Sequence, residues 1–437
     1  MIEVGHTAIR PATARFLVFV FLASIGAVPI LEWAGARRAD SADAPETAWS
    51  HLAGIGEQIR SRLAGEAGIQ AGLTGRIVIA NRAVLEGLAA FENGLEDETR
   101  IGRLLRPPAQ LALSGWLGAG NERVYPGREG WLFYRPEVEY LTGPGFLDPA
   151  ALARRVATSQ EWTAPPQPDP RGAIIRFARQ LDARGITLVV MPTPLKPTVH
   201  PEKLARQYDG WPSPLQNPSY AIFVEDLRRA GVLVFDVADV LVQERRQTGR
   251  PQYLSTDTHW RPDAAALVGE QLAAFVRTHV PLPALPDPGY VIEPREATNA
   301  GDTALMLDLP PDQRLYAPET VTIRRVLGPG GAAWRSSRSA DVLVLGDSFS
   351  NIYSLASMGW GDSAGFVEQV SYTLRRPVDR IVQNDNGAHA TRLSLSRALA
   401  TGEDRLAGKR VVIYQFAARE LAVGDWRLVD LPDTPGK

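Results

Sequence analysis

Short apolar runs alternate with amphipathic stretches through most of the second half of the chain. The runs are mostly apolar, which is typical of strands that a parallel sheet buries on both faces. They lie at 186–191, 232–236, 341–346, 380–383 and 410–416. The stretches between them have the spacing of helices. These lie at 171–184, 220–229, 262–279, 364–374 and 390–399. Strands that alternate with helices predict an α/β fold with a mostly parallel sheet.

The N-terminal segment has the pattern of an export signal, in which basic residues precede an apolar run from Phe16 to Leu31. The run is slightly short of the ~20 residues of a comfortable membrane span, which favours cleavage at Ala34-Gly35-Ala36. Trp33 and the arginines beside it favour an uncleaved anchor. The flanking arginines are Arg10, Arg15, Arg37 and Arg38. We expect the anchor, and in either case we expect the rest of the chain to lie outside the cytoplasm.

The next part of the chain, 39–120, is rich in alanine and leucine and is interrupted by glycines. This pattern predicts several short helices, with a short strand at 77–80. It contains no candidate chemistry, so we expect a helical stalk or cap. An aromatic strand at 125–134, continuing to 143, begins the next domain. The predicted divisions are therefore a signal or anchor at 1–38, the stalk at 39–120 and a main domain at 121–437.

The composition of this 437-residue chain excludes several classes of function. With 45% hydrophobic and 22% charged residues, it is a folded globular protein. A formal net charge of −2 gives no basic surface for phosphates, so we expect no nucleic-acid partner. The absence of cysteine excludes disulfides, thiolate catalysis and cysteine-ligated metals. The six histidines do not cluster along the chain, so we predict no metal site and no cofactor.

A candidate nucleophile follows the apolar run at 341–346, where Gly346-Asp347-Ser348 ends the predicted strand. A serine at the end of a buried strand can project its hydroxyl from the edge of an α/β sheet. It needs an imidazole to take its proton and a carboxylate to orient that imidazole. Asp257 and His259 supply both, because side chains at i and i+2 of an extended segment point to one side. The alternative is that Ser348 only caps a helix.

These motifs together resemble the SGNH-hydrolase-like domain of the alginate O-acetyltransferases of the AlgJ/AlgX type, over roughly 125–416. The motifs that carry the resemblance are GWLFY at 130–134, MPTPLK at 191–196, DTHW at 257–260, Gly301-Asp302, GDSFS at 346–350 and a glycine-containing loop before an arginine, Gly387 to Arg392. The resemblance implies a three-layer α/β/α sandwich and a catalytic triad of Asp257, His259 and Ser348. It also implies a periplasmic protein, anchored here by Phe16 to Leu31 in the inner membrane, that works with a multi-spanning membrane acyltransferase as acetyl donor.

The chain departs from the family after the proposed triad, in the loop 384–389. The family tends to have a glycine pair where this chain has Asn384-Asp385-Asn386-Gly387. An acyl-serine mechanism needs N–H groups that face the developing oxyanion. We expect the backbone of Ser348 to provide one donor, with Asn386 or Gly387 providing another. Arg392 can position a donor or a sugar carboxylate, or form a salt bridge at a helix start.

Three functions remain open from the sequence. The first is O-acetylation of an exopolysaccharide through an acyl-serine at Ser348, with His259 as base and Asp257 as its orienting acid. The second is a carbohydrate esterase, which differs only in that water resolves the acyl-enzyme. The third is a non-catalytic polysaccharide-binding subunit of an export complex. His389 is a rival base in each catalytic case. The intact set of Asp257, His259 and Ser348 argues against the non-catalytic subunit. The resemblance and the expected anchor favour the transferase, with a polysaccharide acceptor, over the esterase.

Overall fold

The computed structural model describes residues 11–36, 48–97, 99–157, 165–384 and 386–432. The chain forms two compact units, and the boundary between Ala112 and Leu113 falls inside helix α5 (Arg100–Leu117). The predicted divisions at 38 and 120 stay predictions. Arg10, Arg37, Arg38 and Asp385, which the sequence analysis names, lie outside the described residues.

The first unit consists of helices. They are α1 (Pro11–Ala36), α2 (Ala48–Ala64), α3 (Glu66–Gln70), α4 (Leu73–Asp97) and most of α5. The strand predicted at 77–80 is wrong, because these residues lie inside α4. Helix α4 is long and packs against α2. Gly87 permits this contact, since a Cβ atom there would lie 2.3 Å from Cγ1 of Ile55.

Helix α1 contains the apolar run from Phe16 to Leu31, and the large side chains for which burial is described are exposed, Phe19 to 70% and Phe21 to 62%. Within the described ranges, no helix combines the length and the apolar character that crossing a membrane requires.

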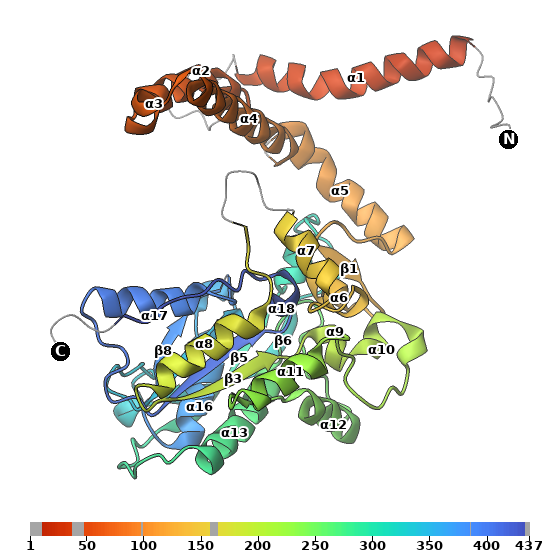
Figure 1. Ribbon diagram of the computed structural model, residues 1–437. Helices are drawn as coiled ribbons and strands as arrows, with labels where there is room; N and C mark the ends of the chain where they lie inside the picture. The colour runs from red at the N-terminus through yellow and green to blue at the C-terminus, as the bar shows by residue number, and fades with distance from the viewer. Residues whose placement is uncertain (1–10, 37–47, 98, 158–164, 385, 433–437) are drawn as a thin grey trace, which may run out of the picture. The chain divides into compact units, whose positions relative to one another are not determined.

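The second unit is built on a five-stranded parallel sheet (Figure 1). Its strands are β3 (Thr187–Thr193), β4 (Leu233–Val234), β7 (Val342–Gly346), β8 (Asp379–Val382) and β9 (Val411–Ala417). The order is β4-β3-β9-β7-β8, and every neighbouring pair is parallel. All residues of β7 and β9 are buried, as a central position in a parallel sheet requires. The predicted α/β fold and its five strands are confirmed.

Helices connect these strands and cover the sheet (Figure 1). They are α8 (Pro170–Asp182), α11 (Tyr220–Arg229), α12 (Ala238–Thr248), α13 (Pro262–His279), α16 (Phe366–Leu374) and α17 (Ala390–Ala400). The connection from β3 to β4 and the connection from β7 to β8 run in opposite directions along the sheet. Since such crossovers are right-handed, α11 and α16 cover opposite faces.

Two antiparallel ribbons accompany the sheet. One pairs β1 (Val124–Pro126) with β2 (Leu132–Tyr134), and the other pairs β5 (Val291–Asn299) with β6 (Glu319–Leu327). The predicted continuation of the aromatic strand to 143 is wrong, because helix α6 (Arg135–Thr142) begins directly after Tyr134. Pro136 occupies the first turn of α6, where its missing N–H is tolerated.

The remaining short elements lie mostly in the connections. They are α7 (Pro149–Ala157), α9 (Lys196–Val199), α10 (Pro201–Leu204), η1 (Arg206–Tyr208), α14 (Asp302–Met306), η2 (Pro329–Gly331), α15 (Ser348–Asn351), η3 (Ala356–Met358) and α18 (Glu420–Val423). Elements α9, α15 and α18 follow the carboxyl ends of β3, β7 and β9. Parallel strands place these ends at one edge of the sheet, which is where α/β proteins form their sites.

Candidate active site

Ser348 lies just after the carboxyl end of the inner strand β7 and begins the short helix α15. Its side chain is nearly buried, with 7% of the residue exposed. The residue that caps α15 is Asp347, whose Oδ1 accepts a hydrogen bond of 2.9 Å from the backbone N–H of Phe349. The capping role therefore belongs to Asp347 and not to Ser348.

Asp347 is fixed by groups of strand β9. Its Oδ2 accepts a 2.6 Å hydrogen bond from the N–H of Ala417, and its Oδ1 accepts one of 2.8 Å from Nε2 of Gln415. The amide oxygen of Gln415 accepts in return from the N–H of Asp347 at 3.0 Å. Nε2 of Gln415 also donates to Oγ1 of Thr193 on β3 at 2.8 Å. This network joins the ends of three strands and holds the turn that carries Ser348.

Asp257 and His259 form the predicted pair. Oδ1 of Asp257 lies 2.6 Å from Nδ1 of His259, and both side chains are almost fully buried. Oδ2 of Asp257 accepts from Nε1 of Trp360 at 2.9 Å and from the N–H of Asp302 at 3.1 Å. The segment is a series of bends rather than a strand, and it leads into α13, which begins at Pro262.

The pair has the electrostatics of a base and its orienting acid. Burial disfavours the imidazolium of His259, but the charge and hydrogen bond of Asp257 outweigh it and raise the pKa of His259. Burial likewise opposes the Asp257 carboxylate, yet the attraction of His259 lowers the pKa of Asp257 to about 2. Nε2 of His259 is buried and has no hydrogen-bond partner within the described residues. An acceptor nitrogen is therefore free at this position.

Phe349 links the pair to the nucleophile candidate. Phe349 directly follows Ser348 in the sequence. Its ring contacts the ring of His259, with a centroid distance of 4.8 Å. Since Nε2 of His259 is unbonded, Ser348 does not donate to it in this structure. Such contacts often form only when substrate is bound. The fold thus brings the segments of all three predicted catalytic residues together, without a hydrogen bond between Ser348 and His259.

Asp302 lies close to the same pair. In the sequence it is noted only as part of the Gly301-Asp302 motif. Its Oδ2 lies 3.7 Å from Nδ1 of His259 and accepts from Oγ1 of Thr258 at 2.5 Å. Burial, followed by the charge of Asp257, raises the pKa of Asp302. Gly301 permits this approach, because its φ is +86° and a Cβ atom would lie 2.2 Å from the carbonyl oxygen of Thr256.

Sequence reasoning missed a buried ionic cluster that comprises Glu137, Lys196 and Arg419. Oε1 of Glu137 accepts from Nη1 of Arg419 at 2.9 Å, and Nζ of Lys196 donates to the carbonyl oxygens of Leu132 and Ser255 at 2.6 and 3.2 Å. Burial raises the pKa of Glu137 to about 7 and lowers that of Lys196 to about 8. The sequence carries no local signal for this cluster, because its three members lie far apart along the chain.

Arg419 also contacts the catalytic region directly. Its guanidinium carbon lies 5.9 Å from the ring centroid of Phe349 and 5.5 Å from that of Tyr134. The positive charge of Arg419 acts against protonation of His259. A cation therefore lies beside the residue that follows Ser348, on the loop after strand β9.

The loop 386–389 approaches the nucleophile turn. Gly387 is buried, and a Cβ atom there would lie 3.5 Å from Oδ2 of Asp347. Asn386 is exposed and has a left-handed backbone with φ of 57°. Arg392 is fully buried and donates from Nη2 to the carbonyl oxygens of Ala388 and Arg427 at 2.6 and 3.2 Å. These contacts fit a residue that positions the loop rather than one that reaches a sugar carboxylate.

His389, the rival base, has a different environment. Its Nδ1 lies 3.0 Å from the carbonyl oxygen of Asp425, to which it donates. Burial lowers the pKa of His389, and the charge of Arg427 adds to this effect. It has no carboxylate that orients it among the residues for which contacts are described. His259 is therefore the better base.

Asp257, His259 and Asp302 also have the composition of a metal site, since one ligand atom from each lies within 4.8 Å of the others. The hydrogen bond between Asp257 and His259 uses the atoms that a cation would need. Oδ2 of Asp302 is engaged by Thr258. The contacts therefore favour a hydrogen-bonded acid and base over a metal centre.

Comparison with known proteins identifies the family of the chain. The family described as SGNH hydrolase-like domain, acetyltransferase AlgX, matches residues 124–418. The chain is 31% identical over 212 residues to the probable alginate O-acetylase AlgJ of Pseudomonas aeruginosa, which covers 47% of this chain and 46% of that protein. The chain thus spans about half the length of that relative.

Two further relatives match over more of their length. The probable alginate O-acetylase AlgJ of Azotobacter vinelandii is 27% identical over 366 residues, which covers 80% of this chain and 83% of that protein. The solved O-acetyltransferase domain of Pseudomonas putida AlgJ is 22% identical and has a TM-score of 0.51, covering 69% of this chain and 92% of that chain. It shows the same fold. Because the family match extends over more than half of its length, the chain belongs to the SGNH hydrolase-like acetyltransferase family of the AlgX type.

Proposed function

We propose that this protein is an O-acetyltransferase that transfers an acetyl group to a hydroxyl of an exopolysaccharide through an acyl-serine at Ser348. The observation that carries the proposal is the pair of Asp257 and His259, in which Nδ1 is held at 2.6 Å and Nε2 is left free beside Phe349. The names of the relatives, probable alginate O-acetylases, support acetyl transfer to a polysaccharide.

The proposed mechanism has two halves, acylation of Ser348 and transfer of the acetyl group to the sugar. In the first, Oγ of Ser348 attacks the acetyl carbonyl of the donor, and Nε2 of His259 takes the hydroxyl proton. The bond between acetyl group and donor breaks, and the proton passes to the leaving oxygen. In the second half, a sugar hydroxyl attacks the acyl-serine and gives its proton to Nε2, which returns it to Oγ of Ser348. Asp257 holds the imidazole tautomer and stabilises the imidazolium that forms in each half.

The oxyanion of each tetrahedral intermediate needs donors. We assign one donor to the backbone N–H of Ser348 and a second to Asn386 or Gly387, on the loop that lies against Asp347. Each such donor contributes about 3 kcal/mol to the transition state in known acyl-transfer enzymes. Arg419, beside Phe349, adds a positive charge to the same region.

We also propose that the enzyme works outside the cytoplasm, because a basic and apolar segment begins the chain. The anchor at Phe16 to Leu31 and cleavage at Ala34-Gly35-Ala36 remain alternatives, and N-terminal sequencing of the mature protein distinguishes them. The acetyl donor partner would be a multi-spanning membrane acyltransferase, which carries the acetyl group across the inner membrane.

Incubation of the purified protein with a small acetyl ester, with and without acceptor oligosaccharide, tests the function. We expect acetylated oligosaccharide to accumulate at the expense of free acetate. Release of acetate that the acceptor does not affect would identify an esterase. In cells, Ser348→Ala should abolish acetylation of the polymer, and unchanged acetylation would indicate a non-catalytic binding subunit.

A further inference from the structure

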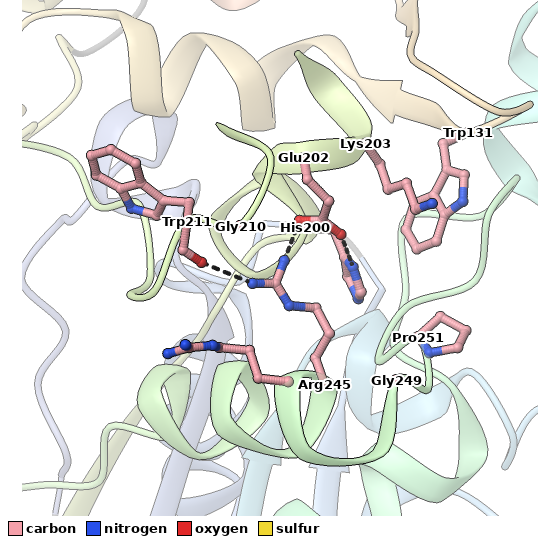
Figure 2. Close-up of a pocket in the computed structure, with 10 residues that line it drawn as sticks. Trp131, His200, Glu202, Lys203, Gly210, Trp211, Arg245, Gly249 and Pro251 are labelled. Atoms are coloured by element: carbon pink, nitrogen blue, oxygen red, sulfur yellow. Dashed lines mark hydrogen bonds and ion pairs between the residues drawn. The ribbon is translucent and has the colours of Figure 1, made fainter. Parts of the chain in front are cut away.

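A pocket of about 430 Å³ lies in the second unit, apart from the residues of the proposed triad (Figure 2). Helices α10 and α12 and the segments beside them supply its walls. The lining residues are Trp131, His200, Glu202, Lys203, Gly210, Trp211, Arg245, Arg246, Gly249 and Pro251. Two tryptophans and three cationic side chains thus surround one carboxylate.

The interior of the pocket is held by a chain of polar contacts. Glu202 bridges His200 and Arg245, with 3.0 Å between its Oε1 and Nδ1 of His200 (Figure 2). Nε2 of His200 accepts from the N–H of Gln252 at 2.9 Å, so Nδ1 carries the proton that Glu202 accepts. Burial lowers the pKa of His200, which favours the neutral ring. The ring of Trp131 packs against the ring of His200, with a centroid distance of 4.7 Å. The wall is therefore preformed.

The pocket offers a positive charge beside an aromatic surface. Glu202 compensates Arg245, and Glu129 compensates Lys203. Arg246 donates to the carbonyl oxygen of Pro212 at 3.2 Å and has no carboxylate partner among the residues that the structure describes. Trp211 is 40% exposed. A guanidinium favours a carboxylate, and an exposed indole favours the apolar face of a sugar ring.

A short segment joins this pocket to the catalytic pair. Pro251 lines the pocket, and only residues 252–256 separate it from Asp257. Even a fully extended chain of this length spans about 20 Å, so the two sites are no farther apart than that along this segment. Tyr253 lies between them, with its ring 6.2 Å from His200 and 6.4 Å from Phe349. This separation is short compared with a polysaccharide chain, so a polymer that runs over the surface has the length to reach both sites.

We propose that this pocket is an acceptor subsite that binds a carboxylate-bearing sugar unit of the polymer while another unit of the same chain meets Ser348. The inference rests on the proposed transferase function, because that function requires a polymeric acceptor. Arg246 pairs with the sugar carboxylate, and Trp211 packs on the sugar ring. The subsite selects acidic over neutral polysaccharides and positions the acceptor, and it takes no part in bond making.

Binding to the full chain carrying Ser348→Ala, which cannot turn over substrate, tests the subsite without chemistry. Titration calorimetry would compare an oligouronate with a neutral oligosaccharide of equal length. We expect the oligouronate to bind more tightly, and Arg246→Gln and Trp211→Ala each to weaken it about tenfold. The matched control is Arg250→Gln, which removes an exposed arginine outside the pocket and should leave the affinity unchanged. Equal binding of both sugars, or wild-type affinity in both pocket variants, would overturn the proposal.

Failure of the subsite and failure of the proposed function give different results. Acetate release from a small acetyl ester by the wild-type protein, without acceptor, depends on the triad alone. If this release occurs while the oligouronate does not bind, the subsite is wrong and the acyl-serine chemistry stands. If the oligouronate binds as expected while no acetate is released, the catalytic proposal is wrong and the pocket remains a saccharide site. With acetyl transfer established, Arg246→Gln should raise the KM for the acceptor about tenfold and leave kcat nearly unchanged.

Discussion

Asp257 and His259 share a hydrogen bond of 2.6 Å between Oδ1 and Nδ1, and the opposite ring nitrogen, Nε2, is buried without a hydrogen-bond partner in the described part of the chain. The carboxylate therefore fixes the tautomer that leaves Nε2 free to accept a proton. Trp360 and the backbone of Asp302 hold the other carboxylate oxygen, so Asp257 cannot easily rotate away. This relationship carries the chemistry that we propose.

Replacing the orienting acid should remove most of the activity. Asp257→Asn can hold His259 in the wrong tautomer and removes the negative charge, so we expect kcat to fall on the order of 10³- to 10⁴-fold. NMR titration should show a lower pKa for His259, because its main favourable interaction is lost. Asp302→Asn is the matched control, since its carboxylate lies farther from Nδ1, at 3.7 Å. Equal losses in the two variants would contradict the assigned roles.

The pH dependence of acyl transfer should follow His259. The base must be neutral, and Asp257 raises its pKa above the ordinary 6.5. We therefore expect kcat/KM to fall with decreasing pH, with a midpoint above 6.5. The same shift means that this group stabilises the fold most below the unfolded pKa, and the contribution disappears as pH rises through the folded pKa. A rate profile with its acid midpoint at or below 6.5 would be inconsistent with this assignment.

The two candidate bases can be separated by substitution. His259→Ala should abolish turnover, whereas His389→Ala should retain most of it, because His389 donates to the carbonyl oxygen of Asp425 and supports the loop. Loss of that bond should lower the free energy of unfolding by about 1 kcal/mol. Steady-state kinetics with a small acetyl ester and urea denaturation measure both effects. Greater loss of kcat in His389→Ala would reverse the assignment.

Gly301 should be essential for the approach of Asp302 to the catalytic pair. In Gly301→Ala the new methyl group meets the carbonyl oxygen of Thr256, and the positive φ adds strain. We expect a loss of about 2–4 kcal/mol in the free energy of unfolding, together with reduced kcat. Gly402→Ala is the control, because Gly402 has a φ of +90° with open space around its Cβ position. Equal destabilisation of the two variants would mean that strain alone explains the effect.

The buried Glu137 should leave a signature in stability against pH. Burial raises its pKa to about 7 from 4.5, so the folded protein holds this proton more tightly than the unfolded chain. The resulting cost grows as pH rises between these values, by up to about 3 kcal/mol. Relative to wild type, Glu137→Gln should therefore become more stable across this window in urea denaturation. Glu139→Gln, a half-exposed neighbour on α6, should show no such trend. A constant difference for Glu137→Gln would refute the prediction.

Much of the fold was accessible from local patterns. The five strands and the main helices were predictable, because buried parallel strands need continuous apolar runs and amphipathic helices need a regular spacing. The ribbon of β5 and β6 was not, since β5 contains Pro294 and a mixture of exposed charges. It is stable through pairing with β6, whose Val321, Ile323 and Val326 are buried. The strand predicted at 77–80 failed because these residues lie within the continuous 25-residue helix α4, on which Ile77 and Val78 are exposed.

By itself, the sequence determined the residue types and the one contact that is local. Asp257 and His259 are two positions apart, so their hydrogen bond could be foreseen, and Ser348 follows a recognisable strand. Only the tertiary structure decided that Gln415 is hydrogen-bonded to Asp347 and that Arg419 pairs with Glu137 beside Phe349. The physical reason is that such contacts join residues far apart in the chain. The order of the strands and the packing between layers bring them together, and neither is written in a local pattern.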